Sequence, residues 1–118
     1  MDSAQFYLRL KHLIHSIDHD VDLADLDLVS MRILEIASLR YLDQKPMTVS
    51  EVMALDSLAS PATLHRKLDG LREADLLLPF NMGADKRTKY LRPSPKALNH
   101  FTKLSNVLEL SFQRSGRA

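Results

Sequence analysis

The most informative segment of the sequence is Ser60-Pro61-Ala62-Thr63-Leu64-His65-Arg66-Lys67-Leu68-Asp69-Gly70-Leu71. Ser60 is a favourable N-cap, and the proline after it suits the first helical position, where a backbone N–H has no partner within the helix. We therefore expect a helix over residues 60–75. Leu64, Leu68 and Leu71 recur at spacings of four and three, which predicts one apolar stripe buried in the core.

The opposite side of this helix is polar and carries Ala62, His65, Arg66 and Asp69. Short side chains near its N-terminus and cations behind them suit a helix that enters the major groove, where base edges and phosphates are both within reach. We interpret 60–75 as a DNA-recognition helix. Its candidate contact residues are Ser60, Ala62, Thr63, His65, Arg66 and Lys67. The carboxylate of Asp69 argues mildly against phosphate contact there, although it can accept a hydrogen bond from cytosine N4.

The residues before this helix predict its partner in a helix-turn-helix. Thr48-Val49-Ser50-Glu51 has the form of a capping box, in which the Thr48 hydroxyl and the Glu51 carboxylate each accept the other residue's backbone N–H. It opens a short helix, and a tight connection at 56–59 leads to the helix at 60–75. Two helices separated by so short a turn, the second with an outward polar face, form a helix-turn-helix.

After the helix at 60–75, the spacing of apolar residues changes from the helical period of 3.6 residues to a period of two residues. Residues 76–80 and 88–92 are extended in pattern, and 81–85 is rich in turn formers, so the sequence predicts a β-hairpin. The segment 81–89 is its tip and carries Lys86, Arg87 and Lys89. A basic hairpin directly after a recognition helix is a wing, suited to phosphates or to the minor groove beside the main site.

Three further helices are expected, at 3–17, at 28–43 with Asp27 as N-cap, and from Ser94-Pro95 to about residue 112. The helix at 28–43 is apolar nearly all round, which predicts a central place in the core. The first and last helices carry apolar residues outside their main stripes, more than a monomer needs. We expect both to contribute to a homodimer.

Composition limits the class of protein. A chain of 118 residues, 45% hydrophobic and 26% charged, is ordinary for one globular domain. It has no cysteine, which excludes disulfides and cysteine-based zinc sites. An apolar run of about 18 residues is absent and the N-terminus does not read as a secretion signal, so we expect a cytoplasmic protein without a membrane partner.

The charge is sorted along the chain. Residues 1–60 carry five basic and ten acidic groups, a net −5, whereas residues 61–118 carry eleven basic and five acidic groups, a net +6. Such a distribution favours one face that approaches a polyanion, although solubility alone would tolerate it.

The stretch Asp85-Lys86-Arg87-Thr88-Lys89-Tyr90-Leu91-Arg92-Pro93-Ser94-Pro95-Lys96-Ala97 resembles the wing exit of MarR-type winged-helix regulators. Residues 48–77 are similar to the family's helix-turn-helix, and the resemblance extends over about residues 5–112. It implies a dimeric transcriptional regulator of a bacterial cytoplasm. Arg87 would be the wing arginine that enters the minor groove and Asp85 the acid that orients it. Asp75 stands where the family usually has glycine, so we expect that corner to be built differently.

Other interpretations remain open. His12, His15 and His19, with Asp18 and Asp20 nearby, have a spacing that can bind zinc, and a ligand- or metal-sensing site near residues 12–22 could tune DNA affinity. A winged helix can also be a protein-interaction module. An enzyme is not expected, because the chain lacks a Gly-rich phosphate loop, a nucleophile beside a base and paired carboxylates in a recognisable context.

The principal hypothesis is therefore a single domain over residues 1–118, mainly α with a small β-hairpin wing. Its fold class is a winged helix-turn-helix with flanking N- and C-terminal helices. Its expected partners are double-stranded DNA and a second copy bound through the terminal helices, with no cofactor. The operator, the effector and the genes served do not follow from the sequence.

Overall fold

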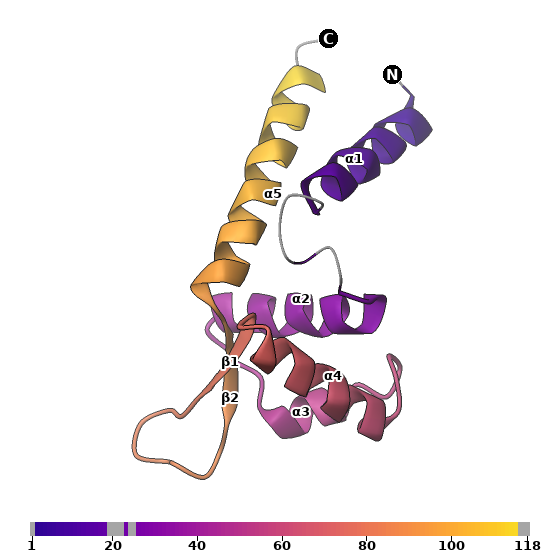
Figure 1. The fold of residues 1–118 in the computed structure, drawn as a ribbon. Helices are drawn as coiled ribbons and strands as arrows, with labels where there is room; N and C mark the ends of the chain where they lie inside the picture. The colour runs from indigo at the N-terminus through magenta and orange to yellow at the C-terminus, as the bar shows by residue number, and fades with distance from the viewer. Residues whose placement is uncertain (1, 19–22, 24–25, 116–118) are drawn as a thin grey trace. The chain divides into compact units, whose positions relative to one another are not determined.

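The computed structural model describes residues 2–18, 23 and 26–115 (Figure 1). The elements are α1 (Ser3–Asp18), α2 (Leu28–Leu42), α3 (Val49–Met53), α4 (Pro61–Glu73), β1 (Leu77–Phe80), β2 (Tyr90–Pro93) and α5 (Pro95–Ser115). The chain divides into two compact units, residues 26–97 and residues 1–25 with 98–118. Within the described residues the fold is mainly helical with one two-stranded hairpin, which confirms the predicted fold class.

Helix α2 forms the base of the 26–97 unit. It begins where the Asp27 carboxylate accepts the backbone N–H of Ser30 at 2.7 Å, which confirms the predicted N-cap. Ile33, Leu34 and Ala37 are buried, and α2 packs on α4 and β2. The helix is central as expected, but it is not buried all round, because three of its leucines are exposed, namely Leu28, Leu39 and Leu42.

Helix α3 begins with the predicted capping box. The Thr48 hydroxyl accepts the Glu51 N–H at 3.1 Å, and the Glu51 carboxylate accepts the Thr48 N–H at 3.0 Å. The hydrogen bond from the Thr48 backbone, with the neighbouring Arg40 guanidinium, lowers the pKa of Glu51. Arg40 lies 3.4 Å from the Glu51 carboxylate and so ties the end of α2 to the start of α3.

Helix α4 starts and faces the core as predicted. Ser60 caps it by accepting the Thr63 N–H at 3.3 Å, and Leu64, Leu68 and Leu71 are at most 1% exposed. The helix ends at Glu73, two residues before the predicted end.

The corner after α4 is where the structure corrects an expectation. Asp75 has a φ of 59°, the left-handed conformation that a glycine usually provides. Its N–H is bonded to the Arg72 carbonyl at 3.1 Å, and the Leu76 N–H to the Leu71 carbonyl at 3.0 Å. These two bonds are those of a Schellman motif. The corner is therefore built in the usual way with an aspartate in the strained position.

Strands β1 and β2 pair antiparallel, with Leu77 opposite Pro93 and Phe80 opposite Tyr90. The second strand begins at Tyr90, not at Thr88 as the alternating pattern predicted. The loop 81–89 extends beyond the paired strands and contains Gly83 with a φ of 59°, which any other residue would adopt only with strain (Figure 1).

A contact that the sequence did not predict holds this hairpin to the helix-turn-helix. The Leu91 N–H donates to the Met47 carbonyl at 2.9 Å and the Val49 N–H to the Lys89 carbonyl at 3.1 Å, so the residues before α3 pair with β2. Phe80 packs between two tyrosines, Tyr41 of α2 and Tyr90 of β2, with ring centroids 5.9 Å away in each case. The base of the wing is thereby fixed to α2 and α3.

The terminal helices match the predicted spans closely. The Ser94 hydroxyl accepts the Ala97 N–H at 3.0 Å and caps α5 as predicted. Tyr7 and Leu8 of α1 and Leu110 of α5 are exposed. Of the helices that the structure describes, none has the length and apolar character that crossing a bilayer requires.

Candidate nucleic-acid interface

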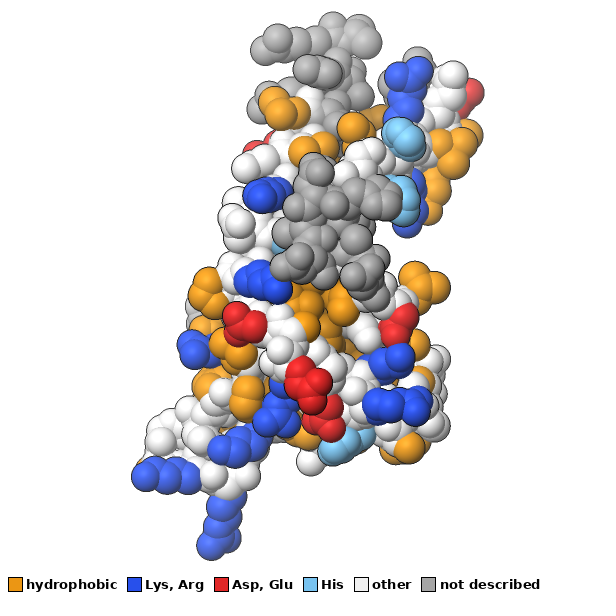
Figure 2. Space-filling model, in the orientation of Figure 1, with side chains coloured by type: hydrophobic (Ala, Val, Ile, Leu, Met, Phe, Trp, Pro, Cys, Tyr) orange, Lys and Arg blue, Asp and Glu red, His pale blue; other side chains and the backbone are white. Residues whose placement is uncertain are grey.

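The nine residues predicted to contact DNA all lie in the 26–97 unit, on α4 with its N-cap and on the wing loop. Thr63 and Lys67 are half-buried and the other seven are exposed. Figure 2 shows basic side chains gathered over the wing loop and again over the region of α4. The two groups of predicted residues are therefore both open to solvent, but their side chains have different partners.

At the N-terminal end of α4, three side chains form a hydrogen-bonded row. Thr63 Oγ1 accepts from the Ser60 hydroxyl at 3.0 Å and from Arg66 Nη2 at 3.4 Å. The row draws the Arg66 guanidinium toward the start of the helix, where the predicted base-reading side chains lie. Restricting an arginine in this way lowers the entropy lost when it binds.

On the next strip of the α4 surface, polar side chains contact one another. His65 Nδ1 lies 3.2 Å from the Asp69 carboxylate, and Arg72 Nη1 lies 3.7 Å from the other oxygen of the same group. Arg72 was not among the predicted contacts, although its position three residues after Asp69 placed it on the same face. Asp69 therefore competes with any phosphate for Arg72 and occupies the neighbouring His65 ring nitrogen.

Lys67 is paired with a residue outside α4. Its ammonium group pairs with the carboxylate of Asp27, the N-cap of α2, and only 31% of the Lys67 side chain is exposed. The hydrogen bond from Lys67 and that from the Ser30 backbone lower the pKa of Asp27 to about 2. The geometry gives Lys67 the role of joining α4 to α2, which the sequence spacing of 40 residues did not reveal.

The wing loop is the opposite case. Within the described part of the chain, the side chains of Lys86 and Arg87 take part in no hydrogen bond or ion pair. Lys89 reaches the Asn81 side-chain oxygen at 3.3 Å, and the Asn81 amide donates to the Thr88 carbonyl at 2.8 Å. Asn81 was not predicted as a functional residue, but it closes the loop from inside. The loop presents its cations outward without internal neutralisation.

Asp85 organises this loop through the backbone. Its carboxylate accepts the N–H of Arg87 at 2.9 Å and that of Thr88 at 3.4 Å, and the Arg87 hydrogen bond is the main cause that lowers the pKa of Asp85. The family resemblance implied that Asp85 orients Arg87. In the structure it fixes the backbone of Arg87, while the guanidinium remains exposed.

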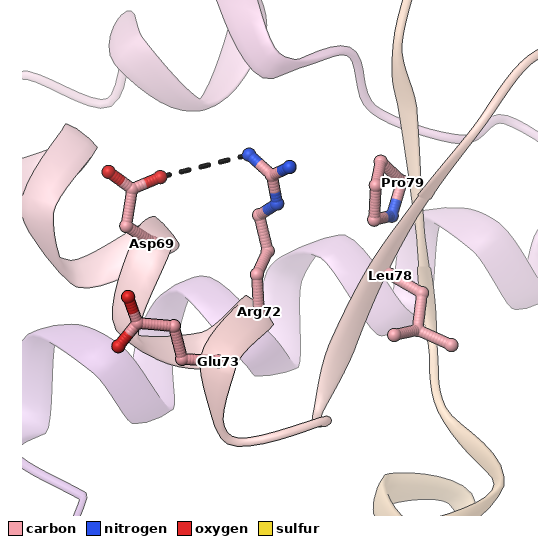
Figure 3. Close-up of a pocket in the computed structure, with 5 residues that line it drawn as sticks. All are labelled: Asp69, Arg72, Glu73, Leu78 and Pro79. Carbon is pink, nitrogen blue, oxygen red and sulfur yellow. Dashed lines mark ion pairs between the residues drawn. The ribbon is translucent and has the colours of Figure 1, made fainter.

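A shallow pocket of about 440 Å³ lies between the second half of α4 and β1 (Figure 3). Asp69, Arg72 and Glu73 line it from α4, and Leu78 and Pro79 line it from β1. The charged lining of this pocket therefore consists of two carboxylates, Asp69 and Glu73, and one guanidinium, Arg72, which lies 3.7 Å from Asp69.

The residues of the predicted metal site are only partly described. His19 and Asp20 lie outside the described residues, and those that the structure does describe contain no group of three or more His, Asp or Glu side chains suited to a metal.

No protein-family model matches this sequence, and none of the curated proteins does. Several solved structures share its fold. The Staphylococcus aureus MarR in complex with salicylate and kanamycin matches with a TM-score of 0.57 and 20% identity over 98% of this chain and 73% of that one. Streptococcus pneumoniae FabT in complex with DNA matches with a TM-score of 0.53 and 16% identity over 92% and 80%.

The zinc-responsive MarR family member ZitR of Lactococcus lactis matches with a TM-score of 0.50 and 19% identity over 79% of this chain and 60% of that one. The chain therefore spans between 60% and 80% of the length of these three proteins. At identities of 20% or less the likeness concerns the fold, and this confirms the predicted fold. The chain has the winged-helix fold of MarR-family regulators.

Proposed function

We propose that this chain binds double-stranded DNA as a transcriptional regulator. The observation that carries the proposal is the pairing of two exposed surfaces in one compact unit. One is the Ser60–Thr63–Arg66 row on α4, and the other is the wing loop with Lys86, Arg87 and Lys89. Among proteins that share the fold, FabT was solved in complex with DNA, which supports the proposal.

In the proposed complex α4 enters the major groove, with Ser60, Ala62, Thr63, His65 and Arg66 near base edges or flanking phosphates. The wing loop lies on the adjacent backbone or in the minor groove. Lys67 is left out of the contact set because it is paired with Asp27. A homodimer formed through α1 and α5, on which Tyr7, Leu8 and Leu110 are exposed, would read two half-sites ~34 Å apart.

The test is binding of a fluorescently labelled random-sequence duplex, followed by anisotropy at about 50 mM and about 200 mM salt. We expect binding whose logarithm falls with the logarithm of salt concentration, with a slope of about −0.9 for each phosphate neutralised. A folded protein that binds no duplex at low salt would overturn the proposal. A protein-interaction module would give only weak binding at low salt, and Arg66→Glu would leave its partner binding intact.

A further inference from the structure

A self-complementary stripe runs along the side of α2 that faces solvent. All the exposed residues of α2 belong to it. They are Leu28, Arg32, Glu35, Leu39 and Leu42, which we call the α2 stripe. Successive members are four, three, four and three residues apart, the spacing of a helix face that packs against another helix.

The apolar members of the stripe are unusually open. Leu28 is 89% exposed and Leu39 is 62% exposed. Ile33, Leu34 and Ala37 point to the other side of α2, where it packs on α4 and β2. The stripe therefore faces away from α4, and a partner bound to it leaves the outer face of α4 free.

The order of residues in the stripe identifies the partner. About a point midway between Ile33 and Leu34, Leu28 mirrors Leu39 and Arg32 mirrors Glu35. When two such helices lie antiparallel with these midpoints together, each Leu28 faces a Leu39 and each Arg32 faces a Glu35 of the other copy. The two leucines at 28 and 39 then meet across the pair and every charge meets its opposite, whereas Leu42 lies beyond the mirrored segment, because α2 begins at Leu28.

Within one chain, Arg32 Nη1 already lies 3.8 Å from the Glu35 carboxylate, so both side chains can reach the centre of the stripe. An antiparallel arrangement brings two such pairs together into a ring of four alternating charges with a leucine pair on either side. Charges placed in this way select this antiparallel register over a slipped one. A slipped register sets charge against leucine or, with the midpoint at Glu35, sets glutamate against glutamate.

We propose that the α2 stripe is a self-association surface that joins two copies of this chain through antiparallel α2 helices. The proposal does not depend on DNA binding. Two helices of 15 residues bury less area than a stable dimer needs, so this contact is weak by itself. Together with a separate dimer contact through α1 and α5, it would link dimers into larger assemblies.

Cysteine cross-linking tests the register directly, because the native chain has no cysteine. Leu28→Cys protein is mixed with equal Leu39→Cys protein that carries a larger tag, under mild oxidation. In the proposed register the two introduced thiols face each other. Two copies of either variant alone hold their thiols about 16 Å apart along the helix axis, too far for a disulfide. We expect the mixed disulfide to form at least tenfold faster than either homodisulfide.

Ser50→Cys, at an exposed position on α3, is the matched control for random collision. The proposal would be overturned if the mixed disulfide formed no faster than the disulfides of this control, or no faster than either homodisulfide. Circular dichroism confirms that each variant is folded, and DNA binding is measured in parallel, so failure of this contact is distinguished from failure of the proposed function.

Charge reversal gives a second test with the same readout. Arg32→Glu in both cysteine variants sets glutamate against glutamate, and we expect the mixed disulfide to form several-fold more slowly. Arg32→Glu in one variant and Glu35→Arg in the other restores opposite charges in every facing pair, and we expect the rate to return. If the stripe were covered by other residues of the same chain, the charge swap would not restore the rate. A rate that does not return would contradict the antiparallel register.

Discussion

The surface of α4 and the wing loop differ in what their cations are bound to. On α4, Arg66 donates to the Thr63 hydroxyl, Arg72 is paired with Asp69, and Lys67 is paired with Asp27. On the wing, Lys86 and Arg87 extend from a loop whose acid, Asp85, is engaged by backbone N–H groups.

This difference suggests that α4 and the wing loop have different roles in DNA binding. A cation already paired within the protein gains little from a phosphate, because it must give up one partner for another. An unpaired, exposed cation releases a counterion from DNA at no such cost. We therefore expect the wing to supply most of the attraction that is independent of sequence, and α4 to supply the discrimination between sequences.

The largest effect is expected on the buried side of α4. Leu68→Ala removes a side chain that is 1% exposed and leaves a cavity, so we expect the free energy of unfolding to fall by about 2–5 kcal/mol. Met82→Ala, in the wing loop at 43% exposure, is the matched change and should alter it by less than about 0.5 kcal/mol. Urea denaturation measures both, and equal losses would show that the wing loop is packed as tightly as α4.

The next effect is expected on the wing. Arg87→Ala should weaken DNA binding about tenfold at low salt, the equivalent of about 1.4 kcal/mol, and make the salt slope shallower by about 0.9. The melting temperature should not change, because the guanidinium has no hydrogen-bond or ion-pair partner among the residues that the structure describes. Arg32→Ala removes the same charge from the far side of α2 and serves as control. Equal affinity of the Arg87→Ala and native proteins would remove the wing from the mechanism.

The pairing of α4 to α2 predicts a pH-dependent effect on stability. Asp27→Asn keeps the N-cap but loses the pair with Lys67, so we expect a loss of about 1 kcal/mol at pH 7, a modest value because both side chains are partly exposed. Asp27 has a pKa of about 2 when folded and 3.8 ordinarily. The extra unfolding free energy of the native protein over Asp27→Asn is fully present above about pH 4, and it disappears as the pH falls toward 2.

Thermal unfolding of the two proteins from pH 7 to pH 2 measures this difference. A constant difference over the whole range would mean that Lys67 does not stabilise the charged form of Asp27. DNA binding of Asp27→Asn should rise slightly, because Lys67 is then released.

The smallest effect concerns the corner that joins the two regions. Asp75→Gly removes the backbone strain of an aspartate in the left-handed conformation. Glycine also has greater freedom in the unfolded chain, and with this cost included we expect the free energy of unfolding to rise by about 0.5 kcal/mol. Chemical denaturation measures it, with Asp75→Ala as the destabilising counterpart. A loss of stability with glycine would show that the Asp75 side chain contributes more than its strain costs.

The local parts of this architecture were predictable because their causes are local. Ser60, Asp27 and the Thr48–Glu51 box cap helices within three residues of themselves, and the leucine spacing of α4 is readable over three turns. The pairing of residues 47–49 with residues 89–91 escaped prediction, because so short a segment shows no apolar period and its partners lie 40 to 44 positions away.

The candidate site was predictable in position but not in pairing. Which side of α4 faces solvent follows from its apolar spacing, so the exposure of Arg66 and His65 was expected. That Lys67 would meet Asp27, and that Asp85 would bind the backbone of Arg87 and not its guanidinium, depends on side-chain directions that only the folded structure shows.

We propose that α4 and the wing loop contact one duplex together, with different roles. The most direct measurement selects a preferred duplex from a random pool and compares its affinity with that of a scrambled duplex for the native, Arg66→Ala and Arg87→Ala proteins. We expect Arg87→Ala to weaken binding of both duplexes equally, and Arg66→Ala to weaken binding of the preferred duplex more and so to lower the preference. The result that would contradict it is an Arg66→Ala protein with undiminished preference, or folded native protein that prefers no duplex.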